Sequence, residues 1–385
     1  MLISKDQWWS MGMIRLNAGR SRSNRLVGNA PNHSFVLARN ALFFSFEALG
    51  IVPGKRALLP SYICLAAVDP FLEFGIHVDF YNVNRDCTID IADIERKLTP
   101  DTQAVLIVHY FGFPQPAHRI RELCDRRGIV MIEDCAHVLT GEFAGKPLGT
   151  FGDAAVFSWR KFLPVYDGAE LVLNRKPVLE VRNNVKESPL YTVKAALNLI
   201  DTSLSQSRGK VPRLAYRLLQ VIESAVRARA RSYITTTAAK LPERATLTFD
   251  RKKAGWPMSK VSRWILTHSN IEKIVRLRRR NYEQLVSELS EIRGVHPLAA
   301  ELPQGVCPWV LPVIFDDLPF AHHRFRSRGI PAVTWDGVRH AGIPRDKFSD
   351  AEFLYENLVF LPIHQCLGEQ DLSSIARTIR DVYTN

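Results

Sequence analysis

An acidic residue and a lysine each follow a segment with the character of a buried strand, and together they could serve one site. The acidic pair Glu133-Asp134 follows the four apolar residues 129–132, and a buried carboxylate is costly without a cationic partner. Lys161 follows the apolar stretch 153–158. A lysine amine that is desolvated in a cleft has a lowered pKa and becomes a usable nucleophile. The alternatives are a structural salt bridge for Asp134 and a surface position for Lys161.

Residues suited to a flat, phosphate-bearing ligand occur at similar positions. Ser158 ends the strand before the lysine, and its hydroxyl can donate to a phosphate oxygen. A helix that begins near Asn40 offers free backbone N–H groups, and Arg39 adds a charge. Tyr62 lies just past a strand and could stack on a heterocycle. Each also has a purely structural interpretation, as a cap, a surface charge or a core residue.

Short apolar runs alternate with helical patterns over the first half of the chain. The expected strands are 56–60, 78–83, 104–110, 129–134, 153–158 and 169–174, and the expected helices are 40–49, 68–74, 91–98 and 117–127. Strands that are apolar on both faces and alternate with helices predict an α/β fold around a mostly parallel sheet. Ligands of such sheets bind beyond the carboxyl ends of the strands, where Asp134, Ser158 and Tyr62 fall.

The patterns divide the chain into an irregular arm at 1–34, a large domain at 35–255 and a small α+β domain at 256–385. In the small domain we expect helices at 270–293, 321–328 and 372–382 and strands at 309–315 and 358–363. Strand signals vanish over 175–250, which we expect to be helical and divergent.

The segment 213–231 has the pattern of an amphipathic basic helix. Its apolar face is Leu214, Leu218, Val221, Ile222 and Ala225, and its cations are Arg213, Arg217, Arg227, Arg229 and Arg231. A helix docked on the body of the protein is favoured over one that touches anionic lipid or a partner. Nucleic-acid binding is disfavoured, because aromatic residues do not interleave with the arginines.

Composition narrows the class of protein further. The 385 residues carry a formal net charge of +12, which suits phosphate-bearing ligands or a solvated basic surface. The six cysteines form no C-x-x-C pair, so we expect no metal site and a reducing compartment. The N-terminus shows no signal peptide, and no apolar run is long enough to span a bilayer. We therefore expect a cytoplasmic location.

The order of these segments resembles the DegT/DnrJ/StrS-type sugar aminotransferases, a branch of the fold-type-I pyridoxal-phosphate enzymes with the aspartate-aminotransferase fold. The resemblance covers roughly residues 35–385 and is weakest over 175–250. The resemblance rests on the segments ARNAL (38–42), LLPSYICLAAVDPFLEFG (58–75), IVHYFG (107–112), IVMIEDCAH (129–137), GTFGDAAVFSWRK (149–161), YDGAE (166–170) and LVFLPIHQCL (358–367). EDCAH followed by GDAAVFS and a lysine is the specific part of the match.

The resemblance implies roles for individual residues. Lys161 would hold pyridoxal phosphate covalently and Asp134 would pair with its pyridine nitrogen. His137 would face the ring or its phenolic oxygen. The ring would stack on Tyr62, and the phosphate would be held by Ser158 and the Arg39-Asn40 turn. Candidate substrate contacts in the second unit are Trp335, Arg339 and His364, with a core position as the alternative for His364.

The activity that the resemblance implies is transfer of an amino group from an amino acid, by analogy L-glutamate, to a nucleotide-linked keto-sugar. The pathway would be polysaccharide or glycosylated-metabolite synthesis, and the enzyme would work as a homodimer. Relatives with histidine in place of the lysine act as sugar dehydratases, so Lys161 favours transamination.

The chain also departs from the family pattern. Ala38-Arg39 replaces a Gly-Thr or Gly-Ser pair, the serine-to-lysine spacing is shorter by two residues, and Tyr166–Ala169 replaces Gly-Glu-Gly-Gly. No asparagine occurs at 255–258 to reach a partner's phosphate, and Arg251, Lys252 or Lys253 would have to substitute. These departures leave open another pyridoxal-phosphate reaction, a non-catalytic regulatory role or an anion-binding module.

Overall fold

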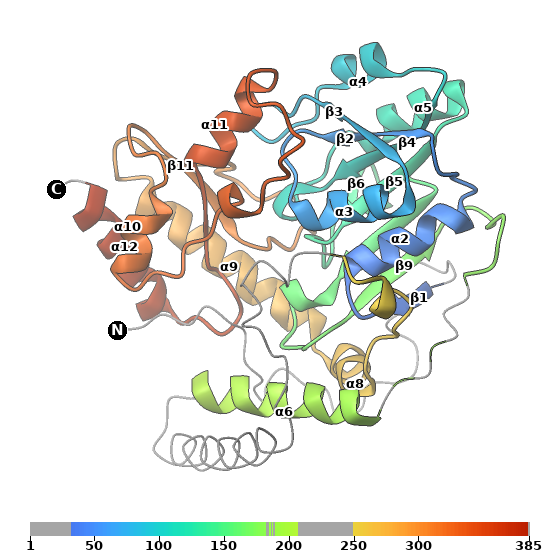
Figure 1. Ribbon diagram of the computed structural model, residues 1–385. Coiled ribbons are helices and arrows are strands. Elements are labelled where there is room, and N and C mark those ends of the chain that lie inside the picture. The colour runs from blue at the N-terminus through green and yellow to red at the C-terminus, as the bar shows by residue number, and fades with distance from the viewer. Residues whose placement is uncertain (1–31, 182–184, 186, 188, 207–248, 384–385) are drawn as a thin grey trace, which may run out of the picture.

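The molecule has a large α/β unit and a smaller unit formed by the C-terminal part of the chain (Figure 1). The computed structural model describes residues 32–383, except 182–184, 186, 188 and 207–248. Among the residues described, no helix has the length and apolar character needed to cross a membrane.

A seven-stranded sheet in the order β1-β9-β8-β5-β4-β2-β3 organises the large unit. The strands from β8 to β3 run parallel, whereas β9 is antiparallel to β8 and β1 is antiparallel to β9. Their bounds are β1 Asn32–Phe35, β2 Arg56–Pro60, β3 His77–Tyr81, β4 Thr102–Val108, β5 Val130–Cys135, β8 Ala154–Ser158 and β9 Ala169–Leu173. The mostly parallel sheet confirms the predicted α/β class.

Helices cover both faces of this sheet, which explains why β4 and β8 are apolar on both faces over most of their length. Figure 1 shows α2 and α3 in front of the sheet and α5 behind it. The bounds are α2 Ala38–Ala48, α3 Leu65–Phe74, α4 Ile91–Lys97 and α5 Ala117–Arg127. The predicted helix ends at 74 and 127 are confirmed, because the next residues, Gly75 and Gly128, adopt the left-handed conformation that ends a helix, with φ of 89° and 64°.

The smaller unit is an antiparallel sheet in the order β10-β11-β12 with helices around it. The elements are α9 Ile271–Leu289, β10 Val295–Pro297, β11 Leu311–Phe315, α10 His322–Ser327, α11 Ser349–Asn357, β12 Leu358–Leu361 and α12 Glu369–Tyr383. The helix α8 Lys260–His268 precedes them and packs on the large unit. The helix α9 joins the two units. Its Ile274 packs in the core of the large unit, and its Leu285 and Leu289 pack in the core of the small one.

Two predicted boundaries need correction. Residues 32–34, assigned to the irregular arm, belong to β1, a short edge strand whose polar sequence gives little signal. The boundary at 255–256 does not separate the two cores, because Ile265 and Leu266 of α8 pack in the large core. The segment 175–250 contains the helix α6 Pro189–Gln206, as its helical character predicted. The basic helix predicted at 213–231 lies outside the described residues.

Candidate active site

A partly open cavity of about 720 Å³ lies at the carboxyl ends of β4, β5 and β8, the edge of the sheet where the sequence places its candidate residues. Side chains from the first turns of α2 and α3 and from the C-terminal part of the chain complete its wall. The polar or reactive residues that border it are Arg39, Cys64, Asp134, His137, Ser158, Arg160 and Lys161, with Trp335 among the apolar ones.

Lys161 ends a short 3-10 turn, Trp159–Lys161, that follows β8 directly. Its Nζ lies over the ring of Trp309, 4.3 Å from the ring centroid. Burial lowers the pKa of Lys161 to about 8, and the positive charge of Arg160 acts in the same direction, while Cys64 and Asp134 oppose it. Roughly a tenth of the amine is therefore uncharged at pH 7, far more than for an ordinary lysine, and the uncharged amine is the state that a nucleophile or proton acceptor needs.

Asp134 lies near the end of β5, and its carboxylate also borders the cavity. Its Oδ1 accepts a hydrogen bond of 2.8 Å from the backbone N–H of Ala136. Burial raises the pKa of Asp134, and the Lys161 cation and the Ala136 hydrogen bond hold it down. The cavity thus presents an acidic group and an amine that interact electrostatically, as predicted for this pair.

His137 is stacked between two aromatic rings, Trp309 at 4.3 Å and Phe111 at 5.9 Å between centroids. Its Nδ1 accepts the backbone N–H of Phe111 at 3.2 Å, so a neutral ring carries its proton on Nε2. Burial lowers the pKa of His137 well below its ordinary value, and the charge of Lys161 adds to this effect. His137 therefore offers the cavity a neutral imidazole.

Arg39, Arg160 and Ser158 give the cavity a region suited to an anion. Arg39 lies in the first turn of α2, and Ser158 ends β8. Burial lowers the pKa of Arg39, and the positive charge of Arg160 lowers it further while Asp69 opposes both. A bound anion such as a phosphate would relieve the repulsion between the two guanidinium groups.

The chain is similar to known aminotransferases in sequence and in fold. Residues 7–174 match the sequence model of the DegT/DnrJ/EryC1/StrS aminotransferase family. Over this span the chain is similar to that family. The chain is 31% identical to GDP-perosamine synthase of Vibrio cholerae over 143 residues, which are 36% of this chain and 39% of that enzyme. It is 34% identical over 135 residues to UDP-N-acetyl-3-dehydro-alpha-D-glucosamine 3-aminotransferase of Acidithiobacillus ferrooxidans, 35% of this chain and 37% of the other.

The matched segments thus span about two fifths of the length of these curated relatives. The fold extends further than the sequence match. The chain superposes on Spr1654 from Streptococcus pneumoniae, solved in its PLP form, with a TM-score of 0.66. This superposition covers 94% of the chain and 90% of Spr1654 at 16% identity, and it shows a common fold.

The structure gives two of the residues implied by the family resemblance other positions. The Asn40 amide donates to the carbonyls of Lys253 and Ala254, at 2.8 and 3.0 Å, so it ties α2 to the turn at 251–254 and does not border the cavity. Tyr62 is fully buried against Trp335 and Tyr355, at 4.9 and 4.8 Å between centroids, and it too is absent from the cavity wall. Aromatic residues from distant parts of the chain enclose it, and its role as a stacking residue stays a prediction.

Of the three candidates from the second unit, only Trp335 borders the cavity. Arg339 forms an ion pair with Glu352 and packs 4.8 Å from the ring centroid of Tyr355. His364 is 5% exposed and lies outside the cavity wall, which agrees with its alternative interpretation as a core residue. The sequence analysis assigned no role to Arg160, Cys64 and Trp309, since no local pattern distinguishes them from ordinary surface or core residues.

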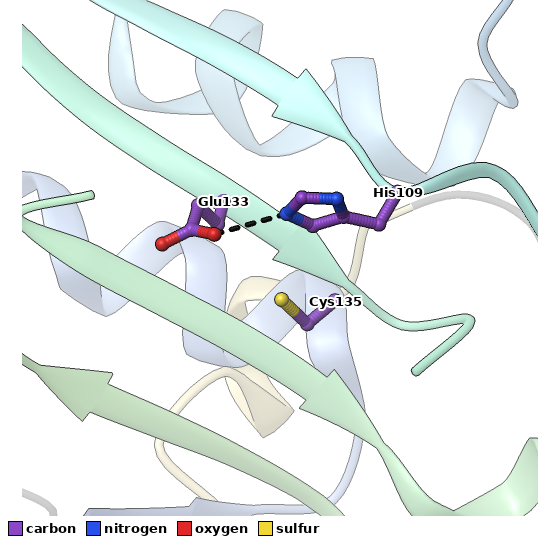
Figure 2. A group of neighbouring side chains, drawn as sticks. All are labelled: His109, Glu133 and Cys135. Atoms are coloured by element: carbon purple, nitrogen blue, oxygen red, sulfur yellow. Dashed lines mark hydrogen bonds and ion pairs between the residues drawn. The ribbon is translucent and has the colours of Figure 1, made fainter. Parts of the chain in front are cut away.

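A second cluster of potential ligand atoms lies beside the site and consists of His109, Glu133 and Cys135 (Figure 2). The three residues are close enough to hold a metal ion, but the oxygens of Glu133 already accept four hydrogen bonds. The donors are Nε2 of His109 at 2.9 Å and the backbone N–H groups of Gly149, Phe151 and Gly152 at 3.0, 2.7 and 2.6 Å. Nδ1 of His109 accepts the backbone N–H of Gln115 at 3.1 Å. The cluster is therefore a structural network. It ties the loop that precedes β8 to the strand β5.

We predict that Glu133→Gln lowers the free energy of unfolding by about 2–4 kcal/mol. The amide nitrogen would face N–H donors that now point at a carboxylate, so buried donors would lose their acceptor. Urea denaturation measures the change. The matched control is Glu142→Gln at an exposed position, expected to change stability by less than about 0.5 kcal/mol. Equal effects of the two substitutions would show that the network does not hold the loop.

The depressed pKa of Lys161 also predicts a dependence of stability on pH. In the cofactor-free protein below pH 8, Lys161 is protonated in both the folded and the unfolded state. Burial of the charged amine destabilises the folded state, whereas the hydrated amine of the unfolded state carries no such penalty. Between pH 8 and 10.5 the folded state loses its proton first and the cost disappears. Lys161→Met should therefore stabilise the protein at pH 7 by about 1–2 kcal/mol, a figure reduced because the cavity admits water.

Urea midpoints of Lys161→Met and wild type at pH 7 and pH 9.5 measure this effect. The advantage of the variant should shrink at the higher pH, and the exposed control Lys260→Met should show no such trend. An advantage that is constant with pH would contradict the assignment of a desolvated amine at position 161.

Proposed function

We propose that the protein is a pyridoxal-phosphate-dependent aminotransferase that transfers an amino group to a nucleotide-linked keto-sugar. The observation that carries the proposal is the convergence of Lys161 and Asp134 on one cavity, with the pKa of the lysine lowered to about 8. Transamination needs an amine that can bond to a carbonyl carbon and can also take and return a proton.

The residues around the cavity fit pyridoxal phosphate. Asp134 would pair with the pyridine nitrogen, and Arg39, Arg160 and Ser158 would hold the phosphate. The neutral imidazole of His137 would face the ring. Arg39 supplies a cation where the family pattern has the second residue of a Gly-Thr or Gly-Ser pair, and Arg160 adds another beside it, so a change of phosphate contacts would offset that departure. The PLP form of Spr1654, which shares the fold, supports the same cofactor.

When bound, the cofactor supplies an aldehyde for covalent attachment and an electron sink for the negative charge that develops as the amino group moves. The Lys161 amine would hold the cofactor, and once free it would accept a proton at Nζ and return it. The carboxylate of Asp134 stabilises positive charge on the ring. Trp309 covers the amine and Trp335 borders the cavity, so both limit the access of water.

The substrate class rests on the relatives and on charge. The curated relatives include a UDP-sugar 3-aminotransferase and a dTDP-sugar 4-aminotransferase. The net charge of +12 suits an acceptor that carries a diphosphate. The proposed amino donor is L-glutamate, by family analogy. The six cysteines are all free, which supports a reducing compartment such as the cytoplasm, and a homodimer is the assembly that the family implies.

We expect the protein loaded with pyridoxal phosphate to change its visible absorption when L-glutamate is added and to release 2-oxoglutarate. A keto-sugar nucleotide should then restore the original spectrum. Lys161→Ala should abolish turnover, because no other amine borders the cavity among the described residues. The control Lys260→Ala, at an exposed position, should retain it.

Turnover by the Lys161→Ala enzyme would contradict the assignment of the lysine. A protein that binds the cofactor yet converts no amino donor would instead favour the non-catalytic or regulatory role.

A further inference from the structure

Arg278 is a buried cation in the middle of α9, between the two hydrophobic cores, with 1% of its surface exposed. Burial lowers the pKa of Arg278 to about 10, so the guanidinium remains charged at neutral pH. In the part of the chain that the structure describes, no carboxylate forms an ion pair with it. A buried guanidinium is destabilising unless its N–H groups form hydrogen bonds. The acceptors of the Arg278 N–H groups therefore indicate what this residue does.

The guanidinium donates to groups from three separate segments. Nη2 reaches the carbonyl of Lys161 at 3.2 Å, and Nη1 reaches the carbonyls of Trp309 at 2.8 Å and Pro308 at 3.3 Å. Nε donates to Oε1 of Gln365 at 2.9 Å. The planar fork of arginine can hold such partners at fixed angles, which a lysine cannot do.

Gln365 extends this contact along the turn that carries the lysine. Its Nε2 donates to the carbonyl of Phe162, the residue after Lys161, at 2.8 Å. Arg278 also packs against the ring of Phe162, 5.0 Å from its centroid. Two side chains of the C-terminal part of the chain therefore hold two consecutive carbonyls of the turn.

The same guanidinium fixes the ring that covers the lysine amine. The carbonyl of Trp309 is held by Arg278, its N–H donates to the carbonyl of Phe111 at 2.9 Å, and its ring lies 4.3 Å from Nζ of Lys161. Arg278 is thus hydrogen-bonded both to the backbone of Lys161 and to the backbone of Trp309, whose ring covers the lysine amine.

We infer that Arg278 and Gln365 form a clamp that positions the amine of Lys161 in the cavity and links it to α9 and the small unit. Neither residue borders the cavity, so both are positioning residues and not catalytic ones. The importance of the clamp for catalysis rests on the proposed function, whereas the clamp itself can be tested without any substrate.

The test measures the protonation of the Lys161 amine in the full-length, cofactor-free protein. Pulses of acetic anhydride at a series of pH values, with mass spectrometry of the peptide that contains Lys161, give the pH midpoint of its reactivity. The groups that act on this amine are Asp134, Cys64, Arg160 and His137, and all four stay unchanged in the variants.

Two variants separate positioning from charge. Gln365→Leu removes the hydrogen bonds to Phe162 and Arg278 without a change in charge, and Arg278→Lys keeps the charge but loses the fork. The matched control is Arg279→Lys. Arg279, the next residue of α9, also donates to two carbonyls, those of Pro303 and Val306, each at 2.8 Å, but not to the turn of Lys161.

We expect the midpoint to lie near 8 in wild type and in Arg279→Lys, and to rise by about one pH unit in both clamp variants as water reaches the loosened amine. Thermal unfolding shows which variants fold. If Arg278→Lys does not fold, Gln365→Leu still tests the inference. Folded clamp variants with the wild-type midpoint, or an equal rise in Arg279→Lys, would overturn the inference. Failure of the proposed function would look different, as a wild-type protein that converts no amino donor.

Discussion

The central constraint is that the Lys161 amine must stay close to the Asp134 carboxylate and away from bulk water. Full hydration would return the amine to its ordinary, protonated state, and loss of the carboxylate would leave an isolated buried cation. The structure satisfies both conditions by placing the two groups at the ends of neighbouring parallel strands and by covering the amine with Trp309.

Because side chains alternate along β5, two adjacent acidic residues have different roles. Glu133 and Asp134 point to opposite sides of the strand. Glu133 binds His109 and the loop 149–152, which fixes the approach to β8, while Asp134 reaches the cavity. The turn after β8 is then held from the other side by Arg278 and Gln365, so elements far apart in the sequence meet at one lysine.

Much of this arrangement can be predicted from the sequence. The buried strands have apolar centres, so β2, β4 and β8 fall close to where expected, and the helices α3 and α5 stop at glycines. Lys161, Asp134, His137, Ser158 and Arg39 all border the cavity, since each lies close to the end of a strand or the start of a helix. Tyr62 and Asn40 do not, because their surroundings come from residues far along the chain. For the same reason Arg278, Trp309 and Gln365 give no signal in a local pattern, where they look like ordinary helix and loop residues.

The most direct test of this account is to locate the cofactor on the chain. The protein is incubated with pyridoxal phosphate, reduced with borohydride and digested, and mass spectrometry identifies the lysine that carries the adduct. Our account predicts one adduct per chain, on Lys161, with at most traces on other lysines. A stoichiometric adduct on a different lysine, or none at any concentration that saturates a typical cofactor site, would contradict it.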